Sequence, residues 1–100
     1  MTTTTAALSP RPSNGTVVEL LRRCGSGDTS ALMRLYDIVS PLVYRLSLLV
    51  LGEEGMAQAS TGRTFAIVWE TAPGYDHAKD GTALPWLLSI AHGEARSQLG

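Results

Sequence analysis

The sequence is short of cysteine, of aromatic residues and of excess charge of either sign. Cys24 is its one cysteine, which excludes an intrachain disulfide and is typical of a reducing compartment. Aromatic residues make up 6% of the 100 residues, and eight Lys and Arg stand against nine Asp and Glu. The resulting net charge of −1 excludes a strongly basic nucleic-acid binder, so any contact with DNA must come from a local patch.

Long hydrophobic runs are absent as well. The longest nearly apolar stretch, residues 42–51, includes Arg45 and Ser47 and is too short and too polar to span a membrane. The N-terminus lacks a basic segment followed by an apolar run, so we expect no secretory signal, no membrane partner and a cytoplasmic location. Apolar residues still make up 44% of the chain, which is enough for the core of one small domain.

Two segments differ in composition. Residues 1–15 are rich in Thr, Pro, Ser and Gly and bury too little to offset the entropy of ordering them, which predicts a flexible tail. Residues 16–100 show helical periodicity throughout, with no internal repeat and no convincing alternation of apolar and polar residues. We therefore expect an all-α domain, a compact bundle of four to five helices around one core.

Capping residues and helix breakers indicate the helix boundaries. Thr16 and Glu19 form a capping box, and Asp28 or Thr29 caps a second helix. Pro41 predicts either a kink or the start of a new helix. The apolar positions at helical spacing are Val17, Leu20, Leu21 and Cys24, then Leu32, Leu35, Tyr36 and Val39, then Leu42, Val43, Leu46, Leu49 and Val50.

The second half of the chain gives weaker helical signals. A helix is expected from about Glu53 to Ala72, although its middle, residues 59–62, is a poor helix former. Pro73 and Gly74 end it, residues 75–81 are expected as a polar loop, and a last helix starts near Thr82. The apolar positions of these two helices are Met56, Phe65, Val68 and Trp69, then Leu84, Leu87, Leu88 and Ala91.

Several short motifs occur in a fixed order along residues 17–100. They are Gly27-Asp28, Leu35-Tyr36-Asp37, Val43-Tyr44, Phe65 with Trp69, Tyr75-Asp76, and Trp86-Leu87-Leu88 with Ile90-Ala91. Each is unspecific alone, but the ordered set resembles the promoter-melting domain, region 2, of extracytoplasmic-function (ECF) sigma factors of the sigma-70 family. That family also has a second domain, which reads the −35 promoter element, and the resemblance places no such domain in this chain.

The resemblance implies two binding surfaces. In the family, the second and third helices dock on a coiled coil of the β′ subunit of RNA polymerase core. The last helix and the loop before it bind the non-template strand of the promoter −10 element and capture an extruded base. Polymerase-facing positions are then Asp37, Gln58, Ala59, Gly62 and Arg63. DNA-facing positions are Tyr75, Asp76, His77, Lys79, Trp86, Ser89, His92 and Arg96.

The expected polymerase surface departs from the family pattern. Two positions that usually carry carboxylates hold Gln58 and Ala59, a usual Gln is replaced by Gly62, and a usual Glu by Arg63. Against a basic polymerase element, these changes remove attraction and add one repulsive charge.

The expected DNA surface departs as well. His92 stands where a basic residue is usual, Gly93 weakens the helix by about 1 kcal/mol relative to Ala, and Glu94 would face phosphate. Residues 75–100 carry two Lys or Arg against three Asp or Glu. Because phosphate contacts dominate nucleic-acid affinity, this balance predicts weak DNA binding.

Other interpretations of single residues remain beside these assignments. Trp69 and Trp86 fit either the core or a platform for base stacking, whereas Tyr36 and Tyr44 are expected in the core with the hydroxyl at its edge. His77 and His92 lack the spacing of a metal site. No nucleophile-base set or phosphate loop is present either, so we expect no enzyme, no metal and no cofactor.

Two functions follow from different classes. The first is transcription initiation as a sigma-factor domain that contacts RNA polymerase core and the −10 element. The alternative is a sigma-like protein-interaction module that binds an anti-sigma factor or another regulator and makes no direct contact with DNA.

Overall fold

The structure, a computed structural model, describes residues 14–80 and 82–100. They form α2 (Asn14–Gly25), α3 (Thr29–Leu51), α4 (Glu54–Thr71), the 3-10 turn η1 (Ala72–Gly74), α5 (His77–Asp80) and α6 (Ala83–Ser97). No strand occurs within these residues, which confirms the all-α bundle. Residues 1–13 of the predicted tail lie outside the described residues, as does Gly81 of the predicted loop.

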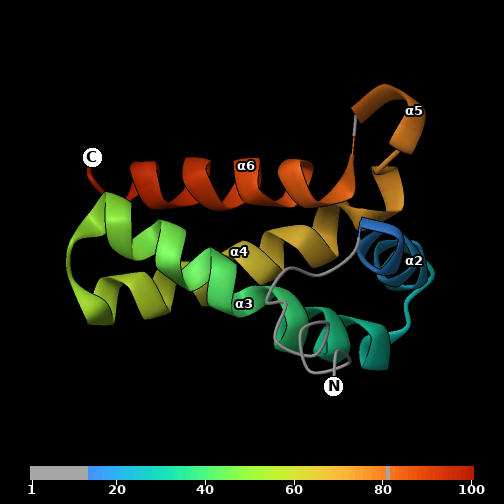
Figure 1. The fold of residues 1–100 in the computed structure, drawn as a ribbon, viewed down its shortest axis with the longest axis horizontal. Helices are drawn as coiled ribbons and strands as arrows, with labels where there is room; N and C mark the ends of the chain where they lie inside the picture. Colours follow the sequence, from blue (N-terminus) through green and yellow to red (C-terminus); the bar gives the residue numbers. More distant parts are fainter. Residues whose placement is uncertain (1–13, 81) are drawn as a thin grey trace, which may run out of the picture.

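The long helices surround one shared core. Figure 1 shows α6 along one side of the bundle, α3 along the other and α4 between them, with α2 near one end. Helix α3 packs against α2, α4 and α6, and α4 packs against both α3 and α6. Within the described part of the chain, no helix is long and apolar enough to cross a membrane.

The periodicity of the first helix places its buried face correctly. Val17, Leu20, Leu21 and Cys24 are all buried, because residues three and four apart share one side of a helix. Burial raises the pKa of the Cys24 thiol, with a smaller contribution from the Asp28 carboxylate. The rest of the buried core comes mainly from Ala31, Leu35, Val39, Val43, Phe65, Val68, Leu87 and Ala91.

Several apolar positions of the pattern are exposed instead of buried. Tyr36 is 43% exposed, which corrects its expected place in the core, and its ring lies edge-on to Phe65 with centroids 4.9 Å apart. Leu35 and Val39 fill the centre of that stripe, so Tyr36 falls at its margin. Met56 and Leu49 are also exposed, since they lie on helix sides that no other helix covers.

Helix α3 is one helix. It passes through Pro41, so the expected alternative of a new helix starting there is wrong. Proline has no N–H to donate to the carbonyl of residue i−4, which here is Asp37. Both residues are exposed, so the interruption falls on the solvent side of the helix, where it disturbs the core least.

Helix α4 forms despite its poor helix formers because their side chains serve its packing. Ser60, Thr61 and Thr64 are all buried between α4 and its neighbours. The hydroxyls of Thr61 and Thr64 donate 2.8 Å hydrogen bonds to the carbonyls one turn earlier, at Ala57 and Ser60. Tertiary packing therefore overrides the low intrinsic propensity of this segment.

The turns between helices use side-chain caps and two glycines with positive φ, Gly27 and Gly52. Asp28 Oδ1 accepts hydrogen bonds from the backbone N–H groups of Ser30 and Ala31, at 3.0 and 3.2 Å, and so caps α3 as expected. Gly52 ends α3 at φ 72°, a conformation that favours glycine. Glu53 then caps α4, its carboxylate accepting from the N–H groups of Gly55 and Met56.

Two boundaries differ from the sequence expectations. Helix α2 begins at Asn14, two residues before Thr16. The predicted loop at residues 75–81 contains the short helix α5, whose Asp80 carboxylate accepts a 2.9 Å hydrogen bond from the N–H of Asp76. This local hydrogen bond closes the turn without any apolar periodicity, which is why the pattern did not reveal it.

The Asp28 cap makes the stability of the bundle dependent on pH. Hydrogen bonds from Ser30, then from the Ala31 N–H, hold the pKa of Asp28 below its ordinary 3.8. A carboxyl whose pKa falls on folding stabilises the protein above its unfolded-state pKa, and this contribution is lost as pH falls through the lowered value. We expect Asp28→Ala to have a lower Tm than the parent at pH 7, with Asp28→Asn between them because Asn keeps an acceptor.

Thermal unfolding followed by circular dichroism at pH 7 and at lower pH checks this expectation. The Tm advantage of the parent over Asp28→Asn should shrink as the pH is lowered below about 4. Equal Tm values for all three proteins at pH 7 would contradict the capping role.

Candidate functional site

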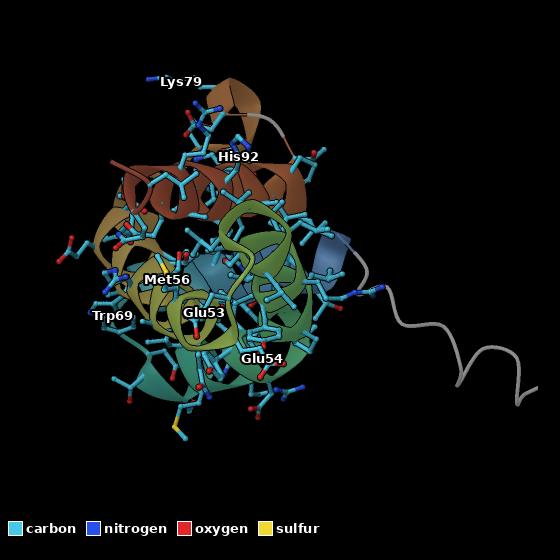
Figure 2. All side chains as sticks on the ribbon, turned by 90° about the vertical axis from the view of Figure 1, so that its left-hand side faces the viewer. Glu53, Glu54, Met56, Trp69, Lys79 and His92 are labelled. Atoms are coloured by element: carbon cyan, nitrogen blue, oxygen red, sulfur yellow. The ribbon has the colours of Figure 1, made fainter. Side chains whose placement is uncertain are left out.

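The outer side of α6 gathers three of the expected DNA-facing residues. Ala83, Leu87, Ala91 and Ala95 recur every four residues and face the core. Ser89, His92 and Arg96 lie on the opposite, exposed side. Figure 2 shows His92 on the side of α6 that faces away from the other helices, with Lys79 of α5 on the same side of the molecule.

Tyr75 and Trp86 form an aromatic pair at the start of α6. Their ring centroids are 4.7 Å apart with the planes tilted by 51°, and both residues are half-buried against the core. Partial burial raises the pKa of the Tyr75 hydroxyl, and the carboxylates of Asp80 and Asp76 add to the shift. The Tyr75 phenol is therefore neutral at pH 7. Tyr75 and Trp86 each pack part of their ring surface against the core. Trp69 is also half-buried against the core.

A hollow of about 470 Å³ opens beside this pair. Its walls are Ile67, Glu70 and Thr71 of α4, Gly74 and Asp80 of the connection, and Trp86 and Ile90 of α6. The volume lies within the range of about 300–1,000 Å³ found for small-ligand pockets. Apolar side chains and two carboxylates share its lining, a composition that suits a planar group with hydrogen-bond donors.

His77 and Asp76 complete the expected DNA-facing set. The backbone of His77 begins α5, and its side chain lies outside the described residues. Asp76 is exposed, and its N–H is engaged by Asp80 within the α5 turn. Across the residues that the structure describes, no group of His, Cys, Asp and Glu is arranged to hold a metal ion.

The expected polymerase-facing residues lie on the exposed sides of α3 and α4. Gln58, Ala59 and Gly62 are exposed on α4, and Asp37 is exposed on α3, one turn before Pro41. Between the two helices runs a groove of about 250 Å³, lined by Tyr36, Ser40, Pro41, Tyr44, Gln58 and Thr61. On the α4 side, Ala59 and Gly62 add no large side chain to this surface.

Arg63, the last of the polymerase-facing residues, is engaged within the chain. Its Nε donates a 2.7 Å hydrogen bond to Oε2 of Glu94 on α6. Gln98 Nε2 donates to the same oxygen, also at 2.7 Å. From the sequence, Arg63 was expected to face polymerase and Glu94 to face DNA phosphate. In the structure these two opposite charges pair with each other across the contact between α4 and α6.

This ion pair belongs to an antiparallel contact between the two helices. Arg63 meets Glu94, and one turn further along α4 and one turn back along α6, Ile67 and Ile90 line the hollow together with Trp86. Sequence spacing gives no sign of such a pairing, because 31 residues separate Arg63 from Glu94.

Curated sigma factors are similar to most of this chain. ECF RNA polymerase sigma factor SigK of Mycobacterium tuberculosis (strain H37Rv) and that of Mycobacterium bovis are each 40% identical to the chain over 76 residues, which are 76% of this chain and 40% of the relative. SigK of Mycolicibacterium vanbaalenii is 38% identical over 76 residues, or 38% of its own length. The domain is a homologue of ECF sigma factors.

The chain spans about two fifths of the length of the curated relatives it matches. No family model matches it, and no solved structure matches it either. The resemblance drawn from the ordered motifs is confirmed by these relatives. ECF sigma factors are not enzymes, which agrees with the expectation of no enzymatic activity.

Two helical glycines, Gly62 and Gly93, lie on exposed surfaces of the domain. A Cβ added at Gly62 or at Gly93 would have no atom within 4 Å apart from its chain neighbours and the nearby backbone of its own helix. We expect Gly62→Ala and Gly93→Ala each to raise the free energy of unfolding by about 0.5–1 kcal/mol, because Ala loses less backbone entropy in a helix.

Urea unfolding of the purified domain measures this gain. Gly52→Ala is the control within the same chain: its φ of 72° strains any residue with a Cβ, so this variant should be less stable than the parent. A loss of stability in Gly62→Ala or Gly93→Ala would contradict the open surroundings of these two positions.

Proposed function

We propose that this ECF sigma-factor domain acts in transcription initiation, docking on RNA polymerase core and holding the non-template strand of the −10 element. The observation that carries the proposal is the exposed face of α6 formed by Ser89, His92 and Arg96, beside the hollow at Trp86. The curated relatives, named as ECF RNA polymerase sigma factors, support the same role.

Contact with polymerase is assigned to the sides of α3 and α4 that bear Asp37, Gln58, Ala59 and Gly62. These residues offer one carboxylate, one amide and two positions without a large side chain, beside a groove with two tyrosines. Such a surface suits a helical partner that packs by shape and apolar contact, as a coiled coil of the β′ subunit would. Because Arg63 is paired with Glu94, its charge opposes this docking less than a free guanidinium would.

Contact with DNA is assigned to α6 and the connection before it. Lys79 and Arg96 would meet phosphates, Ser89 and His92 would line the path of the strand, and the hollow would receive an extruded base. With two cations on this side, the affinity of the isolated domain for a single strand is expected to be low. Docking on polymerase raises the local concentration of promoter DNA, so a weak strand contact suffices in the assembled complex.

Two matched pairs of variants test the proposal in complexes of the domain with RNA polymerase core. Ser89→Glu puts a carboxylate on the expected strand path, whereas Ser26→Glu makes the same change at the exposed turn between α2 and α3. Ser89→Glu should weaken binding of a −10 non-template oligonucleotide by about threefold or more, with core binding unchanged. Ser26→Glu should change neither.

The second pair tests docking itself. Ala59→Trp places a large ring on the exposed side of α4 and should weaken core binding by about tenfold, whereas Ser26→Trp should leave it unchanged. Fluorescence anisotropy of the labelled domain measures core binding. A parent domain that binds neither core nor the oligonucleotide would overturn the proposal, and capture of a purified anti-sigma factor by that domain would favour the interaction-module alternative.

A further inference from the structure

We propose that Arg63 is a positioning residue for the DNA-facing helix: it holds and neutralises the Glu94 carboxylate so that α6 can approach a phosphate backbone. This inference rests on the proposed function, in which α6 contacts the −10 strand. It differs from the expectation for Arg63 drawn from the sequence, where this residue faces polymerase and repels it.

The geometry ties the carboxylate down from two sides. Arg63 Nε and Gln98 Nε2 both donate to Oε2 of Glu94 at 2.7 Å. The Glu94 side chain is only 10% exposed, whereas that of Arg63 is 49% exposed. A charge with so little access to water is screened less than a surface charge, so its compensation depends on the guanidinium beside it.

Glu94 lies close enough to the proposed strand path for its charge to matter. Glu94 follows His92 by two residues and precedes Arg96 by two, which separates it from each by about 3 Å along the helix axis. Its carboxylate lies on the α4 side of α6, about half a turn around the helix from these two side chains, and therefore acts on them across the helix. Both exposed side chains are therefore rooted well within the Debye length of about 10 Å at 0.1 M salt. A carboxylate without a partner at this position would oppose the phosphates that these side chains are proposed to meet.

The charge balance of the DNA-facing part changes once Arg63 is counted with it. Residues 75–100 carry Lys79 and Arg96 against Asp76, Asp80 and Glu94. Adding Arg63 makes the balance three against three. The guanidinium that compensates Glu94 thus comes from α4, the helix that also carries the proposed polymerase surface.

A mechanical role is the competing explanation, in which the pair only clips α4 to α6. A cycle of four proteins separates the two roles: the parent, Arg63→Met, Glu94→Gln and the double variant. Arg63→Met leaves a carboxylate without its cation, Glu94→Gln leaves a cation without its carboxylate, and the double variant removes both charges. The double variant has lost the clip but has the same net charge as the parent.

Binding of the −10 non-template oligonucleotide to each protein, assembled with RNA polymerase core, is the measurement. We expect Arg63→Met to weaken binding by about threefold at low salt, Glu94→Gln to strengthen it, and the double variant to return to the affinity of the parent. The differences should shrink as salt is raised, and core binding should stay within about twofold in all four proteins. The Tm of each of the four domains, measured without polymerase or DNA, shows separately how much the Arg63–Glu94 pair stabilises the contact between α4 and α6.

The outcomes distinguish this inference from the proposed function. A parent that binds no oligonucleotide in the complex overturns the proposed function, and the inference falls with it. A parent that binds, with a double variant as weak as Arg63→Met, shows a mechanical clip and overturns the inference alone. Core binding changed more than about twofold by Arg63→Met in either direction, with oligonucleotide binding unchanged, also overturns it, since Arg63 would then act toward polymerase.

Discussion

The packing of α4 between α3 and α6 is the constraint on which the other features depend. A helix with two neighbours must bury two sides, and α4 does so with small hydroxyl residues such as Ser60 and Thr64 as well as with Phe65 and Val68. The remaining side, which includes Gln58, Ala59 and Gly62, is exposed. The antiparallel contact with α6 also brings Arg63 to Glu94 and, toward the other end of the contact, leaves the hollow beside Trp86.

This arrangement places two proposed binding surfaces on adjacent parts of one small bundle. The polymerase-facing surface and the DNA-facing side of α6 share α4 as their support, so a change on one helix reaches the other through side-chain contact. The balanced charge of the domain suits such a design, because neither surface relies on a large basic patch.

Much of the fold follows from the sequence, because local rules govern it. The stripe beginning at Val17, the cap at Asp28 and the end of a helix at Gly52 all obey spacing and backbone preferences that a single segment contains. The order of the motifs was enough to indicate the sigma-factor family. The pairing of Arg63 with Glu94 could not be predicted in this way, because it depends on how two helices, far apart in sequence, lie against each other. The exposure of Tyr36 and Leu49 depends on the same tertiary information, since it is set by which helix sides the neighbours cover.

We propose above that the outer side of α6 meets the non-template strand. Site-specific photo-crosslinking tests it most directly, with a photoreactive amino acid in place of His92 and, as a control, in place of Arg22, whose side chain is 72% exposed on α2. In a complex of the domain, polymerase core and promoter DNA, the account predicts a crosslink from position 92 to the non-template strand of the −10 element and none from position 22. A crosslink from position 92 to protein alone, in a complex that contains the promoter, would contradict it.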